Sequence, residues 1–262
     1  MCGRFLLIAS PEELRALFGF LDDEPGPLPA EPGLAGRVAG WFPPRYNIAP
    51  TQPIAIVRET PRGRRLALVR WGLVPPYVKD PRTFRLLINA RSETAAETGA
   101  FRAAMRYRRC LVPASGFYEW RREASGRKQA FHIRPRGGGL LAFAGLWETW
   151  LGADGSEIDS GAILTTAANP TVAPIHDRMP VIVAPGDFAL WLSAKVPAEE
   201  VAGLLQPADE SVLEAIPIGP RVNSADNDDA ALLDPVDPAV AAAADAERKA
   251  RPRRPDPQLK LF

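Results

Sequence analysis

Short stretches with the character of β-strands follow one another through the middle of this 262-residue chain. Each is rich in β-branched, aromatic or other apolar residues, and residues typical of turns separate them. The predicted strands span residues 53–58, 65–74, 110–120, 130–134, 140–150, 162–166 and 181–184. This succession predicts a core that is mostly β.

Helical patterns are few and short by comparison. They occur at residues 11–18, 93–106, 187–192 and 198–205. Ser10 is placed to cap the first of these helices, since a serine oxygen can accept a hydrogen bond from a free backbone N–H of the first turn. We therefore expect an α+β fold with a single mostly β domain, in which mixed or antiparallel sheets form a barrel-like core with flanking helices. The domain is placed at residues 2–234.

Two segments lack the patterns of regular structure. Residues 22–44 carry many prolines and glycines, which predicts a long surface loop. From residue 235 the chain is alanine, proline and charged residues, with almost no apolar residue before its last four. Such a composition cannot bury enough apolar surface to fold, so residues 235–262 are predicted to form a disordered tail.

The start of the chain and its cysteines limit the classes of protein it can belong to. The first twenty residues lack a basic start and an unbroken apolar run, and no later stretch approaches the roughly 18 apolar residues of a membrane span. We expect a cytoplasmic protein, a monomer that does not contact the membrane. Cys2 and Cys110 are too few for a disulfide framework and are not near histidines at metal-ligand spacing, so neither a metal nor a cofactor is expected.

Positive charge is concentrated in the middle of the chain. Residues 58–136 hold 19 Lys and Arg against 6 Asp and Glu, whereas residues 198–247 hold 12 acids and one base, Arg221. Arginines make up 27 of the 32 basic residues, and their planar guanidinium suits bidentate contacts with phosphate. Genome base composition explains the preference for arginine equally well, but it does not explain the clustering.

The chain begins Met-Cys-Gly-Arg-Phe, and Cys2 is small enough for the initiator methionine to be removed. Removal leaves Cys2 with a free α-amine beside its own thiol. An α-amine has a pKa of about 7.7–8.0, against about 10.4 for lysine, so it can attack an aldehyde near neutral pH. The thiol can then close on the imine carbon as a five-membered thiazolidine, with an effective molarity of roughly 10⁵–10⁸ M. In DNA, the ring-opened sugar of an abasic site is such an aldehyde.

Six further segments follow Cys2 in a fixed order. They are Tyr46-Asn47-Ile48-Ala49-Pro50-Thr51, Trp71-Gly72-Leu73-Val74-Pro75, Ile88-Asn89-Ala90-Arg91-Ser92-Glu93-Thr94, Gly116-Phe117-Tyr118-Glu119-Trp120, Ile163-Leu164-Thr165-Thr166-Ala167-Ala168 and Ile175-His176-Asp177-Arg178-Met179-Pro180. Together with Cys2 they resemble the SOS-response-associated peptidase (SRAP) family, from Cys2 to about Asp229. Six ordered motifs are far more specific than any one of them.

The resemblance implies four catalytic residues. The N-terminal cysteine forms the thiazolidine with the abasic sugar, an asparagine hydrogen-bonds near the linkage, a glutamate is the acid/base, and a histidine assists sugar opening and reversal; these fall on Cys2, Asn89, Glu119 and His176. A carboxyl held among aromatic residues also has its pKa raised by desolvation, which suits proton transfer. The alternative for Glu119 is an outward-facing strand residue. The other histidine, His132, is expected to be a satisfied structural or exposed residue.

DNA contacts are expected beside these residues. The predicted contacts are Arg4, Asn47, Trp71, Tyr77, Arg91, Ser92, Thr166 and Arg178. Arg91 matches a phosphate-binding arginine of the family, and aromatic rings can stack on bases whatever the sequence. Core packing is the alternative for Trp71, and Tyr77 stands where some relatives carry tryptophan. Cys110, inside an apolar stretch, is expected to be buried and inert.

Three functions remain open at this stage. The first is a protein that senses abasic sites in single-stranded DNA and crosslinks to them through Cys2 after removal of Met1, shielding the lesion, with lyase and self-reversal activity beside it. The second is a peptidase in which Cys2 is the nucleophile, acting in autoprocessing. The third is a non-covalent binder of single strands. The first hypothesis makes single-stranded DNA at damaged sites of the nucleoid the expected partner and location.

The last five residues form a separate motif. Gln258, Leu259, Leu261 and Phe262 resemble the QLxLF peptide by which bacterial polymerases and repair proteins bind the sliding clamp. A disordered tail presents such a peptide well away from the domain. The alternative is that these residues fold back onto the domain or match by chance.

Overall fold

The computed structural model describes residues 2–21, 43–124 and 126–237. Its strands are β1 (Phe5–Leu7), β2 (Arg45–Ile48), β3 (Pro53–Thr60), β4 (Gly63–Trp71), β5 (Asn89–Arg91), β6 (Arg109–Ala114), β7 (Gly116–Arg122), β8 (Lys128–Pro135), β9 (Leu141–Leu151), β10 (Glu157–Ala167), β11 (Arg178–Pro180) and β12 (Leu213–Ile218). The helices are α1 (Pro11–Phe18), α2 (Arg102–Tyr107) and α3 (Phe188–Leu192), with 3₁₀ turns η1 (Pro185–Asp187), η2 (Ala202–Leu205), η3 (Glu210–Val212), η4 (Pro220–Asn223) and η5 (Ala230–Leu233).

Five strands close into a barrel in the order β10-β4-β3-β6-β9, with β9 pairing back to β10. Neighbouring strands are antiparallel except β4 and β10, which pair in parallel. Closure leaves the ring without a free edge. Two short strands extend it from β10: β5 in parallel and β11 antiparallel. The expected α+β fold with a barrel-like core is confirmed.

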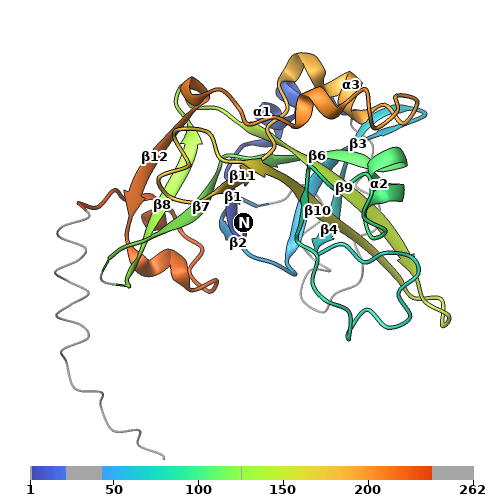
Figure 1. Cartoon of the computed structure of the whole chain (residues 1–262), viewed down its shortest axis with the longest axis horizontal. Helices are drawn as coiled ribbons and strands as arrows, with labels where there is room; N and C mark the ends of the chain where they lie inside the picture. The colour runs from blue at the N-terminus through green and yellow to red at the C-terminus, as the bar shows by residue number, and fades with distance from the viewer. Residues whose placement is uncertain (1, 22–42, 125, 238–262) are drawn as a thin grey trace, which may run out of the picture.

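A second, antiparallel sheet lies against the barrel, with the strand order β12-β8-β7-β1-β2. In Figure 1, β12 and β8 lie at one side of the molecule and the barrel strands at the other, and the N-terminus lies between them. The strand that follows Cys2 is therefore flanked on both sides, by β7 and β2. None of the helices in the described residues is long and apolar enough to cross a membrane.

An aromatic cluster joins the two sheets. Phe5 of β1 meets the ring of Trp71 edge-on at 5.2 Å between centroids, and Phe117 of β7 meets Phe143 of β9 at 5.9 Å. Phe5 also contacts Phe143, at 6.1 Å. All four side chains are buried in one continuous core. Each such aromatic side chain contributes about 1.5–3 kcal/mol through burial alone, so the cluster fixes how the sheets sit on each other.

Helix α1 begins and ends as its sequence indicates. The Ser10 hydroxyl accepts from the backbone N–H of Glu13 at 3.2 Å, and the Glu13 carboxylate accepts from the N–H of Ser10 at 2.7 Å. This capping box satisfies two free donors of the first turn. Gly19 ends the helix in the left-handed conformation, with φ 62°. The predicted helix is confirmed residue for residue. The helix predicted at 187–192 is confirmed as α3, which begins one residue later, at Phe188.

Other predicted elements are wrong in extent. The expected strand at 110–120 is two strands in different sheets, β6 and β7, separated at Ser115. Near Ser115 both strands are buried on both faces, so no alternation of polar and apolar residues in the sequence marks the boundary between them. The expected helix at 93–106 is helical only from Arg102, and turns and a bend take up residues 92–101. In place of the helix predicted at 198–205, the structure has only the 3₁₀ turn η2 (Ala202–Leu205).

The predicted strand at 181–184 is also wrong. Val181 donates to the carbonyl of Leu164, whereas Val183 donates to that of Ala142, so the segment bonds to two different strands. The paired strand, β11, lies just before it. Most of the predicted loop at 22–44 and most of the predicted tail at 235–262 lie outside the described residues.

A buried arginine holds the segment after α3 to the barrel. The Arg109 side chain, 3% exposed, donates to the carbonyls of Trp191 at 2.6 Å, Met105 at 2.8 Å and Val196 at 2.9 Å, and to that of Ser193. Burying a guanidinium is costly unless its donors are satisfied. Here four carbonyls accept from it, one in α2 and three between positions 191 and 196, so one side chain connects both segments to β6.

Arg109→Met is expected to lower the free energy of unfolding by at least about 3 kcal/mol, because buried carbonyls lose their donor. The measurement is urea unfolding followed by tryptophan fluorescence. Arg122→Met, at the exposed end of β7, is the matched control and should change stability by less than about 0.5 kcal/mol. Equal effects of the two substitutions would show that the Arg109 network is dispensable.

Candidate active site

Cys2 lies just before β1 of the five-stranded sheet, and its side chain is fully buried in the core that this sheet shares with the barrel. Its thiol approaches the carbonyl of Arg4, with Sγ 3.8 Å from the oxygen. The same oxygen accepts the backbone N–H of Tyr118 at 3.0 Å, next to Glu119 on β7. The segment before β1 is thus held against β7 by backbone contacts.

Asn89, the first residue of β5, reaches Cys2 from the barrel side. Its amide nitrogen donates to the Cys2 carbonyl oxygen at 2.8 Å. The other amide atom, Oδ1, is buried and has no hydrogen-bond partner among the residues that the structure describes. An acceptor without a donor is costly in a buried position. Asn89 therefore fixes the backbone of Cys2 through its amide nitrogen, while its Oδ1 is a hydrogen-bond acceptor that no described residue uses.

Glu119 supplies a carboxyl group from β7. Its side chain is only 3% exposed. Burial raises its pKa to about 7, and the negative charge of Asp177 also raises it. The pKa of the Cys2 thiol is raised as well, chiefly by burial and then by the charge of Glu119. Near neutral pH the carboxyl can therefore both give and take a proton, while the thiol stays protonated.

His176 approaches from the segment between β10 and β11. Burial lowers its pKa, so the ring is neutral near pH 7. Its Nδ1 accepts from the backbone N–H of Arg178 at 3.0 Å, which places the proton of the neutral ring on Nε2. Asp177 Oδ1 also lies 2.9 Å from Nδ1, an approach that becomes an ion pair only when the ring is protonated. The ring is thus oriented by its own loop.

The four predicted catalytic residues come from four separate segments, and contacts or electrostatic coupling connect them. Asn89 bonds to Cys2, the charge of Glu119 acts on the Cys2 thiol, and the His176–Asp177 loop acts on Glu119 through Asp177. The alternative of an outward-facing strand residue does not describe Glu119, because the side chain is buried. The arrangement places the backbone of Cys2, its protonated thiol and a carboxyl with a pKa of about 7 at one junction.

The predicted DNA contacts differ in accessibility. Arg91 is exposed at the end of β5, and Tyr77 is 62% exposed in the segment after β4. Ser92, partly exposed, donates its backbone N–H to the carbonyl of Thr165 at 2.9 Å. Arg91 and Tyr77 are therefore the members of the predicted set whose side chains are presented to solvent.

Other members of the set are engaged within the protein. Arg178 forms a bidentate pair with Glu93, at 2.6 and 2.8 Å, which lowers the pKa of Glu93 to about 2. Thr166 is 4% exposed. The Trp71 ring is fully buried and donates from Nε1 to the carbonyl of Ile88 at 2.9 Å. In this structure, Trp71 is a core residue and does not present a stacking surface.

Arg4 and Asn47 form a clamp on the N-terminal segment. Arg4 donates to Asn47 Oδ1 and to the carbonyl of Val222, both at 2.8 Å, and Asn47 Nδ2 donates to the carbonyl of Asn227 at 2.8 Å. Asn47 is fully buried. In this structure both side chains hold β1 and β2 against the segment after β12, and their contact with DNA stays a prediction.

Asp228 was not anticipated from the sequence. Its Oδ1 accepts the backbone N–H groups of Tyr46 at 2.5 Å and Asn47 at 2.9 Å, and its other oxygen pairs with Arg45. It anchors β2 and, through Asn47, the Arg4 clamp. The only signal in the sequence is that this acid belongs to the acidic stretch at 198–247, and nothing local links it to β2.

His132 lies outside this site. It pairs opposite Tyr118 on β8, whereas Glu119 pairs opposite Phe131, so the two side chains face opposite sides of the sheet. His132 is 4% exposed, and its Nε2 has no hydrogen-bond partner in the described residues. The expectation of a satisfied or exposed histidine is wrong, because the ring is buried with one nitrogen unpaired.

The closed barrel, the flanking sheet and the buried Cys2 at their junction define a single-domain β protein with an N-terminal cysteine site. The profile of the SOS response associated peptidase (SRAP) family matches residues 1–225. Since the match covers most of its length, the chain belongs to this family.

Curated relatives and solved structures agree with this assignment. The abasic site processing protein YoaM of Bacillus subtilis is 37% identical over 235 residues, covering 89% of this chain and 98% of that protein. The abasic site processing protein YedK of Escherichia coli is 29% identical, covering 90% of this chain and 100% of that protein. A protein of Bacteroides thetaiotaomicron shares the fold, with a TM-score of 0.77, 23% identity and coverage of 90% and 100%.

The raised pKa of Glu119 predicts a pH-dependent stability difference. Between the ordinary value of 4.5 and about 7, the folded protein retains a proton that the unfolded chain has released, so its stability falls as pH rises through this window. Glutamine has no such proton. Glu119→Gln should match the wild type at pH 4 and exceed its free energy of unfolding by up to about 3 kcal/mol at pH 8.

The measurement is urea unfolding of both proteins at several pH values from 4 to 8. Glu157→Gln, at the exposed start of β10, is the control and should track the wild type throughout. A difference for Glu119→Gln that does not vary with pH would show that the buried carboxyl is not the titrating group.

Proposed function

We propose that this protein processes abasic sites in single-stranded DNA by forming a covalent crosslink through Cys2 once Met1 has been removed. Membership of the SRAP family and similarity to proteins named for abasic site processing support the substrate. The observation that carries the mechanism is the position of Cys2. Its backbone is fixed by Asn89, and a carboxyl with a pKa of about 7 lies in the same site.

The chemistry proceeds in two steps. The α-amine of Cys2 attacks C1′ of the ring-opened sugar, and the resulting carbinolamine loses water to give an imine; protonated Glu119 gives the departing hydroxyl its proton. The thiol then adds to the imine carbon. A C–S bond forms, the imine nitrogen gains a proton, and the thiol proton is released. The product is a thiazolidine, which resists the hydrolysis that reverses a simple imine.

The environment of the thiol favours this function over a peptidase. A thiol peptidase needs a thiolate, which is stabilised by an electropositive site. Burial and the charge of Glu119 instead raise the pKa of the Cys2 thiol. In the second step above the thiol needs no standing thiolate, because its proton can be transferred to the imine nitrogen as the C–S bond forms.

Asn89 and His176 have supporting roles in this mechanism. In this proposal the buried Oδ1 of Asn89, which has no partner among the described residues, accepts a hydrogen bond from the Cys2 amine and so orients its lone pair. The Nε2–H of neutral His176 is a donor suited to opening the sugar and to reversing the linkage. An imine also acidifies the neighbouring C2′ proton. A lyase step would follow if Glu119 removed that proton and the 3′ phosphate departed.

The exposed basic residues account for binding of the strand. Arg91 is proposed to contact a phosphate next to the lesion, and Tyr77 to stack on a neighbouring base. Stacking of this kind contributes about 1–3 kcal/mol per base and tolerates any sequence. The excess of basic residues between positions 58 and 136 adds a sequence-independent attraction to the backbone.

The decisive experiment is a gel of mature protein incubated with single-stranded DNA that contains one abasic site, after boiling in detergent. Wild type should give a shifted band that intact DNA does not give. Cys2→Ser should lose the stable band, because oxygen closes the corresponding ring less favourably than sulfur, yet borohydride should still trap its imine. A preparation that retains Met1 should give neither product.

Cys110→Ala is the matched control, since Cys110 is the other buried cysteine and lies in the barrel strand β6. It should crosslink at the wild-type rate. A serine variant whose detergent-stable band equals that of the wild type without reductant would exclude the thiazolidine and leave non-covalent binding or peptidase chemistry in its place.

We also propose that the C-terminal peptide binds the replication sliding clamp. Gln258, Leu259, Leu261 and Phe262 lie outside the described residues, so the proposal rests on the sequence. Tethering there would raise the local concentration of the protein where stalled synthesis exposes single strands. A peptide of residues 254–262 should bind the host's clamp, and the same peptide with Leu261 and Phe262 replaced by alanine should not. Equal or absent binding for both would end this proposal and leave the Cys2 chemistry untouched.

A further inference from the structure

Asp177 follows His176 in the segment just before β11, and the mechanism proposed above gives its carboxylate no role. Its Oδ1 lies 2.9 Å from Nδ1 of His176. The Asp177 side chain is 85% exposed, whereas that of His176 is 27% exposed. The carboxylate therefore contacts a half-buried ring of the site from the side that faces solvent.

The Nδ1 atom of His176 has two neighbours that require opposite protonation states. The backbone N–H of Arg178 donates to it at 3.0 Å, which requires a lone pair on that nitrogen. An ionised Asp177 can only accept, so its oxygen at 2.9 Å is repelled by a lone pair on Nδ1 and hydrogen-bonded by an N–H there. Each of the two neutral tautomers thus satisfies one neighbour and forfeits the other.

The neighbouring arginine leaves this carboxylate to the ring. Both oxygens of Glu93 accept from the Arg178 guanidinium, at 2.6 and 2.8 Å, and the carbonyl of Thr165 accepts from it as well. Burial lowers the pKa of His176, and the charge of Asp177 acts in the opposite direction. The carboxylate therefore favours a proton on the ring at the nitrogen that it contacts, Nδ1.

The position of the proton decides what Nε2 can do. With the proton on Nε2, that nitrogen donates a hydrogen bond but cannot release the proton, because release would leave an imidazolate. With the proton on Nδ1, Nε2 has a lone pair and can act as a base. Opening of an abasic sugar needs a base, because the C1′ hydroxyl must lose a proton while the ring oxygen O4′ gains one.

We propose that Asp177 is a positioning residue that holds a proton on Nδ1 of His176 and so gives Nε2 the lone pair that opens the abasic sugar. Nε2 takes the proton of the C1′ hydroxyl, the C1′–O4′ bond breaks as the carbonyl forms, and the imidazolium gives the same proton to O4′. While the imidazolium exists, it is paired with Asp177. This inference rests on the proposed function, since the abasic sugar is its substrate.

The tautomer is measured by ¹⁵N NMR of the mature full-length protein at pH 8, where the lowered pKa of His176 keeps the ring neutral. The chain has two histidines, and His176→Gln assigns their signals. In the wild type, the His176 nitrogens should show that Nδ1 carries the proton in part or all of the molecules. Asp177→Asn should move the proton to Nε2, because the asparagine amide can donate to Nδ1.

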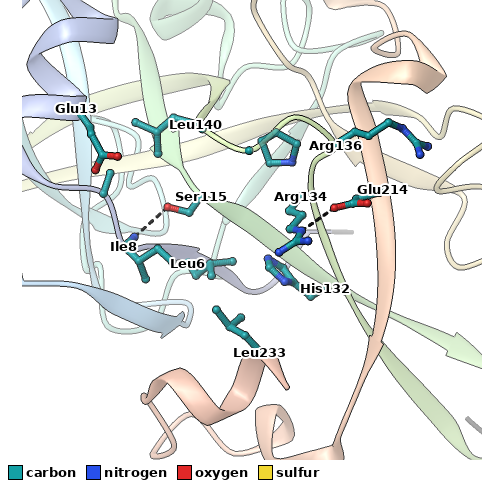
Figure 2. A pocket seen from close by; sticks show the side chains of 14 residues that line it. Leu6, Ile8, Glu13, Ser115, His132, Arg134, Arg136, Leu140, Glu214 and Leu233 are labelled. Carbon is teal, nitrogen blue, oxygen red and sulfur yellow. Dashed lines mark hydrogen bonds and ion pairs between the residues drawn. The ribbon is translucent and has the colours of Figure 1, made fainter. Parts of the chain in front are cut away.

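His132 is the internal reference in these spectra. It lines a hollow beside β8 together with Leu6 and Arg134, as Figure 2 shows. Its side chain faces the other side of the sheet from Glu119. The His132 nitrogen shifts should therefore be the same in the wild type and in Asp177→Asn.

Crosslinking rates separate this role from a structural one. An abasic sugar must open before it reacts, whereas an oligonucleotide that carries an acyclic aldehyde at the same position needs no opening. Asp177→Asn should slow crosslinking of the abasic strand at least about 10-fold, since proton transfer by a positioned group contributes about 10²–10⁴-fold. It should leave crosslinking of the acyclic strand at the wild-type rate.

Asp187→Asn, at the end of η1, is the matched control and should behave like the wild type in both measurements. A pure Nε2–H tautomer in the wild type, a tautomer that Asp177→Asn does not change, or equal slowing with both strands would overturn the proposal. If the wild type crosslinked neither strand, the proposed function would fail, and with it the proton transfer, while the spectra would still decide whether Asp177 holds the proton on Nδ1.

Discussion

The aromatic cluster between the two sheets is the constraint on which the rest of the structure depends. Phe5 and Phe117 come from the five-stranded sheet, and Trp71 and Phe143 from the barrel. Edge-to-face packing of buried rings has a definite geometry and tolerates little sliding. Cys2 lies three residues before Phe5, so the packing of that ring places Cys2 against β5, the strand that carries Asn89 and extends the barrel from β10.

Burial sets the chemistry of the site. A carboxyl on the surface would be ionised throughout the physiological range, and a thiol near cations would be a thiolate. The junction between the sheets excludes water, which raises the pKa of Glu119 to about 7 and keeps the thiol of Cys2 protonated. The same close packing that stabilises the fold therefore also sets the protonation of both groups near neutral pH.

Local signals in the sequence predicted local structure well. Helix α1 was located to the residue because its cap, formed by Ser10 and Glu13, lies within four positions. The candidate site came from ordered motifs, but motifs do not show whether a side chain faces solvent, and Trp71, Arg4 and Asn47 proved to be engaged within the protein. Barrel closure through β9 and β10, the short strands β1 and β5, and the role of Asp228 all depend on contacts between distant segments, for which no local pattern exists.

The clamp formed by Arg4 joins parts of the chain that are made at very different times. Its partner Val222 is 218 positions away, a distance that takes a ribosome about 10–45 s to cover at 5–20 residues per second. The earliest residues to leave the ribosome thus receive their final support from nearly the last of the domain. A nascent chain that lacks the last part of the domain therefore lacks the support that holds β1 and the segment carrying Cys2 in place. Placement of the N-terminal segment is in this way coupled to synthesis of the rest of the domain.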